Sequence, residues 1–196
     1  ADENERLATL RSYAILDTAP ESAFDRLTSY AAKQFNVPVA LVSLVDENRQ
    51  WNKASCGMDE PELPRDLSFC SYTVLDDEVN YIPDASKDER LKDNPFVTGE
   101  PHLRFYAGAP LIAPNGQRLG SFCIIDDKPR HDFGKHEQSM LEDLAAMVVE
   151  QMDMRMATGV VAKEIETRLT AEQKSKAAER QIHALAKNAP IGIALI

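Results

Sequence analysis

The sequence predicts an α+β fold in which helices flank a strand-rich middle. Two stretches with helical spacing lie before residue 36, and strand-like apolar runs lie between residues 37 and 126. Residues 134–187 contain no proline and, inside that interval, a single glycine, Gly159. Because proline and glycine are the residues that most disfavour helix interiors, this last stretch is expected to be one long helix.

The first two helices follow from apolar residues that recur three and four positions apart. Residues 4–14 have this pattern, and Asp2 or Asn4 can accept hydrogen bonds from the free amides at the helix start. A second helix is expected over residues 22–35, with Pro20 at its first turn. Its apolar face comprises Phe24, Leu27, Ala31 and Phe35.

The strands are expected in the middle of the chain. Residues 37–45 are apolar on both faces, which is typical of a central strand that is covered on both sides. Asn115 and Gly116 form a dipeptide that favours a tight hairpin turn. Residues 58–67 contain two prolines and four acids and are expected to form a loop. The expected strands are residues 37–45, 49–57, 79–83 and the two halves of 104–127.

The long helix carries an apolar seam that predicts a dimer. The seam contains two polar positions, Gln151 and Thr158, and it is polar again between Ile165 and Ile182. Such a seam finds its simplest partner in the same helix of a second chain, which favours a homodimer. The alternative is a solvated single helix held by charge pairs such as Glu164 with Arg168. The seam residues are Leu144, Met147, Met154, Val161, Ile165 and Ile182.

Composition excludes several classes of function. The formal charge of -10 repels a phosphate backbone, so nucleic-acid binding is not expected. No apolar run approaches the roughly 18 residues that a membrane span needs, and we expect a cytoplasmic location. The three cysteines, Cys56, Cys70 and Cys123, form no CxxC pair, so no metal site is predicted and reduced thiols are expected.

Several strings in order along the chain resemble a GAF domain of bacterial signalling proteins. They include "RLATLRSYAILDTAPESAFDRLT", "LPRDLSFCSYTVLDDE" and "GQRLGSFCIIDDKPR". The resemblance is to the subclass found ahead of PAS domains, histidine kinases and diguanylate cyclases. The string "ERQIHALAKNAPIGIALI" resembles the start of a PAS domain. The expected organisation is a GAF domain over 1–154, a coiled-coil linker over 155–187, and the start of a truncated PAS domain over 188–196.

The resemblance implies a central antiparallel sheet with helices on one face and a pocket on the other. Two segments, residues 61–75 and 83–103, would form the roof of that pocket, and we call them the roof segments. The cofactor stays unknown. The cysteine-histidine pattern of bilin-binding members is missing, because Ser71 follows Cys70 and Ile124 follows Cys123. The Asn-Lys, Phe, Asp-Glu pattern of the cyclic-nucleotide-binding members cannot be placed in matching context in this sequence either.

Seven residues form the candidate ligand site, each with a structural alternative. Arg65 and Arg104 could bind an anion or could pair with an acid such as Asp66 or Asp126. Ser68 is expected to cap a short helix that begins at Phe69. Tyr106, Gly108 and Pro110, with Ser121, Cys123 and Ile125 of the partner strand, either line a pocket or lie under a closely packed helix. The candidate set is Arg65, Ser68, Phe69, Cys70, Arg104, Tyr106 and Cys123.

We therefore predict a non-catalytic sensory module that passes a signal to a downstream PAS and effector domain. Two alternatives stay open: a thiol enzyme that reduces free methionine sulfoxide, and a ligand-free dimerisation spacer. For the thiol enzyme, Cys123 would have to react with Cys70 or Cys56, and a thiol in the middle of a strand is expected to be inert. Any kinase or cyclase output would lie outside these residues.

Overall fold

The computed structural model describes residues 2–188, and for residues 181–188 it describes the backbone alone. The chain divides into two compact units, Ala1–Met154 and Arg155–Ile196. The predicted PAS strand falls on residues 189–196, outside the described residues.

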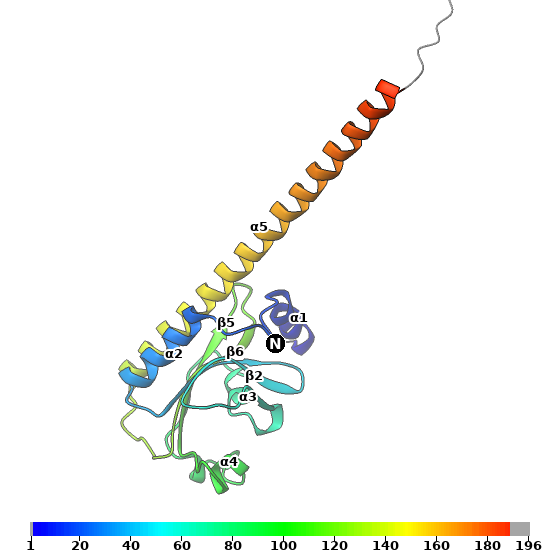
Figure 1. Cartoon of the computed structure of the whole chain (residues 1–196). Helices are drawn as coiled ribbons and strands as arrows, with labels where there is room; N and C mark the ends of the chain where they lie inside the picture. The colour runs from blue at the N-terminus through cyan, green and yellow to red at the C-terminus, as the bar shows by residue number, and fades with distance from the viewer. Residues whose placement is uncertain (1, 189–196) are drawn as a thin grey trace, which may run out of the picture. The chain divides into compact units, whose positions relative to one another are not determined.

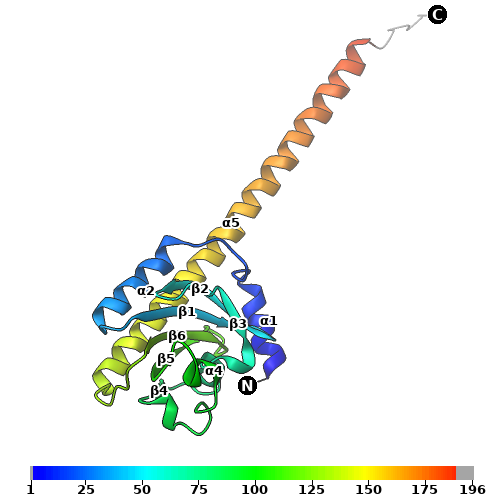
Figure 2. The ribbon, with the colours of Figure 1, turned by 60° about the horizontal axis from the view of Figure 1, so that its bottom comes forward.

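The first unit is built on an antiparallel sheet in the order β3-β2-β1-β6-β5-β4 (Figures 1 and 2). β1 and β6 lie at its centre, and every neighbouring pair is antiparallel. The α+β prediction is therefore confirmed. The strands are β1 Val39–Val45, β2 Arg49–Cys56, β3 Glu62–Pro64, β4 Asn80–Ile82, β5 Phe105–Ile112 and β6 Arg118–Asp126.

Apolar side chains on both faces place β1 at the centre, as predicted. All seven of its residues are buried. Gly57 ends β2 with a φ of +83°, and a side chain there would clash with the carbonyl of Pro38. The expectation of a plain loop over 58–67 is wrong in part, because Glu62–Pro64 pairs with β2 as an edge strand.

Helices cover both faces of the sheet. Figures 1 and 2 show α2 and the first part of α5 along one face, and α3 and α4 on the other side. Asp2 caps α1 by accepting a hydrogen bond from the Asn4 amide at 3.0 Å, as predicted. Pro20 lies before α2, not in its first turn, because that helix begins at Ser22. The helices are α1 Glu3–Ser12, α2 Ser22–Gln34, α3 Cys70–Thr73, α4 Pro95–Thr98 and α5 Lys135–Asn188.

α5 changes character along its length. In its first part Leu141, Val148 and Met152 are buried within the first unit. Leu144 is also only 6% exposed, so it has little surface left for a second chain. From Met154 onward most of the described apolar side chains are exposed, with Val161 at 57% and Ile165 at 53%. The side chain of Ile182 lies outside the described residues.

Candidate functional site

The candidate site lies between the sheet and the roof segments, on the side of α3 and α4. Tyr106, Cys123 and Ile125 belong to the apolar cluster on this face, as the alternation of β5 and β6 predicts. The roof segments contribute Phe69, Cys70, Val74, Leu91 and Val97 to the same cluster. The sequence therefore assigned the correct face of both strands.

Tyr106 fills the space that the small residues leave open. Its side chain is fully buried, and its ring meets Phe69 edge-on with the centroids 5.5 Å apart. Its hydroxyl lies 2.7 Å from Thr73 Oγ1 and 3.2 Å from Ser121 Oγ. A Cβ at Gly108 would clash with this hydroxyl, so the ring lies directly over the glycine. Burial raises the pKa of Tyr106 well above its ordinary value, and the phenol stays neutral.

The sequence left open whether Tyr106, Gly108 and Pro110 line a pocket or lie under a closely packed helix. The structure has the closely packed helix. α3 and Tyr106 cover the sheet, and a small, mostly apolar cavity of about 30 Å³ remains. Ligand pockets usually measure about 300–1,000 Å³, so this cavity has room for only a very small molecule. Ser68, Phe69, Cys70 and Tyr106 line it, which accounts for four of the seven candidate residues.

A second buried polar group connects the roof to the sheet. Ser68 Oγ donates to Gln50 Oε1 at 2.5 Å, and Gln50 Nε2 donates to Ser43 Oγ at 3.0 Å. Ser68 Oγ also accepts from the Ser71 amide at 3.1 Å, which is the expected cap, although α3 begins at Cys70 and not at Phe69. Sequence reasoning missed Ser43 and Gln50. The signal for Ser43 is a polar residue inside the otherwise apolar β1, whereas Gln50 lies in a mostly polar strand and has no such signal.

The two buried cysteines lie side by side, although one belongs to α3 and the other to the middle of β6. Cys70 Sγ and Cys123 Sγ are 3.7 Å apart, because α3 packs directly on β6. Burial disfavours the Cys70 thiolate, but hydrogen bonds from Cys123 and from Tyr106 lower the pKa of Cys70 overall. The hydrogen bond to Cys70, together with burial, raises the pKa of Cys123 well above its ordinary value. Cys56 is half-buried and forms no disulfide with Cys70 or Cys123.

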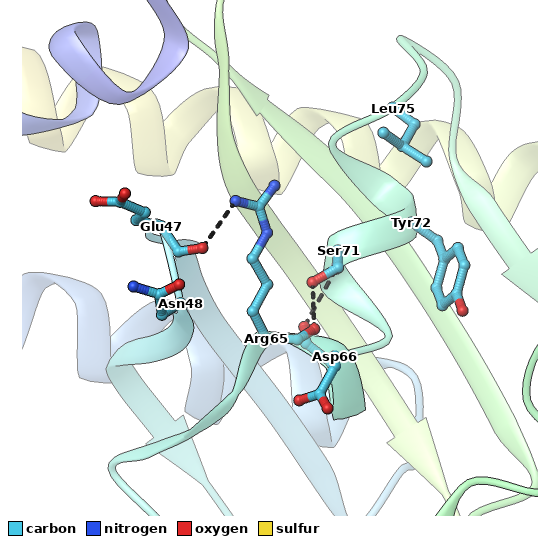
Figure 3. A pocket seen from close by; sticks show the side chains of 8 residues that line it. Glu47, Asn48, Arg65, Asp66, Ser71, Tyr72 and Leu75 are labelled. Atoms are coloured by element: carbon cyan, nitrogen blue, oxygen red, sulfur yellow. Dashed lines mark hydrogen bonds between the residues drawn. The ribbon is translucent and has the colours of Figure 1, made fainter. Parts of the chain in front are cut away.

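Arg65 is held by its own chain at an open depression of about 500 Å³ (Figure 3). Its guanidinium donates to Glu3 at 2.6 Å and to the carbonyl of Glu47 at 3.2 Å. Figure 3 shows the guanidinium directed toward Glu47 and away from Asp66. Arg65 is therefore a structural residue, and its carboxylate partner is Glu3, not the neighbouring Asp66.

Arg104 anchors a roof segment through backbone carbonyls. Its guanidinium donates to the carbonyls of Val97 and Leu103, each at 2.9 Å, so it holds a roof segment in place. The predicted ion pair with Asp126 is wrong, because that carboxylate pairs with Arg130 instead. Arg130 Nη2 lies 2.5 Å from Asp126 Oδ2. Arg130 Nε also donates to Asp126 Oδ2, at 2.8 Å.

A larger groove of about 600 Å³ lies next to the small cavity. The groove and the cavity share Met58, Leu63, Phe96, Leu103 and Ile125 as lining residues. The rim of the groove is acidic, and it carries Asp59, Glu60, Glu100, Asp126 and Asp127. A small molecule that crossed the shared apolar side chains would pass from solvent to Cys70.

Comparison with known proteins now identifies the fold family. Residues 19–152 match the model of the GAF domain. The chain belongs to the GAF domain family. A cyclic di-GMP phosphodiesterase of Pseudomonas aeruginosa is 39% identical over 160 residues, which are 82% of this chain. The chain spans only 27% of the length of that relative.

Solved GAF structures agree with this fold. The GAF domain of an Acinetobacter phosphoenolpyruvate-protein phosphotransferase superposes with a TM-score of 0.57 at 22% identity, over 80% of this chain and 98% of that one. A free methionine-R-sulfoxide reductase of Neisseria meningitidis gives 0.58 at 12% identity, over 79% and 90%. At these identities the likeness concerns the fold alone. None of the described helices is long and apolar enough to span a membrane.

Proposed function

We propose that this GAF domain is a cytoplasmic sensory module that dimerises through α5 and controls an enzyme of cyclic di-GMP turnover. The 39% identity to a cyclic di-GMP phosphodiesterase supports that output, and it favours cyclic di-GMP turnover over the histidine kinase of the initial expectation. We also propose that residues 188–196 begin a PAS domain between this module and the output enzyme. The small cavity beneath the roof segments is the proposed point of regulation.

The observation that carries this proposal is an apolar stripe on α5. Met147, Met154, Val161, Ile165 and Leu169 are each about half exposed, between 47% and 60%. At 3.6 residues per turn these five positions fall within about 80° of one another around the helix. An exposed stripe of this length is typical of a helix that meets a second helix.

The size of the stripe is compatible with a dimer that one substitution can break. Burial of a half-exposed side chain of this kind contributes about 1 kcal/mol, so ten of them in two chains contribute about 10 kcal/mol. Association itself costs roughly 4–15 kcal/mol. Since these two quantities are similar, a charge at one seam position should separate the chains.

Light scattering on residues 1–196 at micromolar concentration tests the dimer. We expect a two-chain mass for the unchanged chain and a single-chain mass for Ile165→Glu. Thr167→Glu is the matched control, because Thr167 is exposed on the same helix but off the stripe. It should stay dimeric. A single-chain mass for the unchanged chain would contradict the proposal.

The regulatory role is tested in the full-length protein. Hydrolysis or synthesis of cyclic di-GMP should change in Ile165→Glu and not in Thr167→Glu. Equal activity in all three proteins, with the dimer lost in Ile165→Glu, would leave α5 without a role in regulation. Failure of every protein to act on cyclic di-GMP would instead contradict the proposed output enzyme.

One observation favours a second candidate function, a thiol-dependent reductase of free methionine sulfoxide. The 3.7 Å separation of the Cys70 and Cys123 sulfurs provides two thiols that could be oxidised together. Against it, the small cavity of about 30 Å³ has no room for an amino acid. Turnover of free methionine sulfoxide with dithiothreitol, lost in Cys70→Ser, would establish this alternative.

A further inference from the structure

We propose that Cys70 and Cys123 are a peroxide-reactive thiol pair that forms a disulfide between α3 and β6. This inference does not depend on the proposed dimer or on its output enzyme. The two sulfurs are 3.7 Å apart and belong to elements that lie far apart in the sequence. A disulfide bond is about 2.05 Å long, so the separation of the two sulfurs must fall from 3.7 Å to about that value.

The cavity selects the oxidant by size. Cys70 lines the small cavity of about 30 Å³, whereas Cys123 does not line it and lies 3.7 Å from Cys70. Hydrogen peroxide is little larger than water, and it can cross from the larger groove where Met58, Phe96 and Leu103 line both spaces. Oxidised glutathione and other bulky disulfides are too large for this space. The reactant is therefore hydrogen peroxide and not an exchange partner.

The surroundings of the two thiols give them different roles. Cys70 Sγ accepts a hydrogen bond from the Tyr106 hydroxyl at 3.5 Å and lies in contact with the Cys123 thiol. Both donors stabilise a thiolate at Cys70, and the pKa of Cys123 is raised. Because the thiolate is the nucleophile, Cys70 attacks and Cys123 resolves.

The reaction consumes one peroxide and releases two water molecules. The Cys70 thiolate attacks one oxygen of hydrogen peroxide, the O–O bond breaks, and the other oxygen leaves as water after taking up a proton. Cys70 is then a sulfenic acid. The sulfur of Cys123 attacks Cys70 Sγ and gives up its proton, the S–O bond breaks, and the second water leaves. Two electrons pass from the thiols to the peroxide.

The disulfide would change the roof of the candidate site. Drawing Cys70 toward β6 moves the start of α3, where Ser68 Oγ accepts from Ser71 and donates to Gln50. At the other end of the same helix, Thr73 contacts the Tyr106 hydroxyl. Both sets of hydrogen bonds must rearrange, so the oxidised domain presents a different roof from the reduced one.

Peroxide treatment of residues 1–196, followed by alkylation under denaturing conditions and peptide mass spectrometry, tests the proposal. We expect a cross-linked peptide pair containing Cys70 and Cys123, and an alkylated Cys56. Reduction with dithiothreitol should restore three alkylated cysteines. Recovery of Cys70 and Cys123 as free thiols while Cys56 is oxidised would overturn the proposal. So would a sulfinic acid at Cys70 without a cross-link.

Variants separate the two roles. In Cys123→Ser, dimedone should trap a sulfenic acid at Cys70, whereas in Cys70→Ser the thiol of Cys123 should stay unmodified. Cys56→Ser is the matched control and should form the cross-link at the unchanged rate. A sulfenic acid at Cys123 in Cys70→Ser would reverse the assignment of the attacking thiol. Circular dichroism on each variant checks that it is folded, and the cross-link in the unchanged chain tests the proposal without any variant.

Discussion

Replacement of Tyr106 by phenylalanine is the most direct test of how the candidate site is closed. The change removes one oxygen atom and keeps the ring that packs edge-on against Phe69. It leaves Thr73 and Ser121, both fully buried, without the hydroxyl that lies 2.7 Å and 3.2 Å from their side-chain oxygens. The effect is therefore one of hydrogen bonding and not of cavity formation.

The magnitude follows from the number of buried partners. Loss of one hydrogen bond costs about 1 kcal/mol net, and a buried hydroxyl left without its partner raises the cost to about 1–3 kcal/mol. Thr73 keeps one contact, at 3.5 Å from Asn80 Nδ2, which limits the penalty. We expect Tyr106→Phe to lower the free energy of unfolding by about 2 kcal/mol, which in a domain of this size lowers Tm by roughly 4–8 °C.

Thermal unfolding followed by circular dichroism measures this change. Tyr81→Phe is the matched control, because the Tyr81 hydroxyl donates to the carbonyl of Arg130 at 2.8 Å but the side chain is only partly buried. We expect it to cost at most about 1 kcal/mol, since water can replace the lost donor. Equal Tm values for the two variants would refute the reasoning that the Tyr106 network holds the roof closed. Tyr106→Phe should also slow the peroxide-dependent cross-link.

Two further predictions concern charge and packing. The buried guanidinium of Arg6 donates two hydrogen bonds to Glu3 and lowers the pKa of that carboxyl from 4.5 to about 2. Glu3→Gln should therefore lower the free energy of unfolding at neutral pH. This loss, measured by urea unfolding, should shrink as the pH falls from 4.5 toward 2, since only the charged carboxylate stabilises the folded state. A loss that is independent of pH would contradict this. Gly108→Ala should lower the free energy of unfolding by about 1–3 kcal/mol because its methyl group displaces Tyr106. Gly159→Ala, whose methyl group would have nothing within 4 Å, should instead increase the helical signal of α5. An equal loss of stability in the two variants would contradict the packing argument.

Local physical chemistry made several parts of this fold predictable. The apolar run of β1 requires cover on both faces, and the Asn115-Gly116 turn fixes the β5–β6 hairpin, so both could be predicted from short stretches. Alternation along β5 assigned Tyr106 to the face of the candidate site. The edge strand β3 was missed because three residues with a proline carry no periodic signal.

The candidate site was less predictable, because contacts between distant segments decide it. Arg104 and Arg65 could each have paired with several acids, and the choice depends on which carboxylates the fold brings near them and which are already occupied. Asp126 is taken by Arg130, and Arg65 meets Glu3 from the far N-terminus. No spacing in the sequence reports either fact.

The sequence by itself determined the fold class, the faces of the central strands and most of the apolar stripe on α5, because each depends on the period of side chains along one backbone segment. Leu144 of the predicted seam is buried within the first unit, and Leu169 was not predicted. Only the tertiary structure decided that the site is closed by Tyr106 and that Cys70 meets Cys123 at 3.7 Å. Both depend on how α3 packs over the sheet. The reason is physical: a period fixes which way a side chain faces, but the distance between two elements is set by the volumes of all the side chains that pack between them.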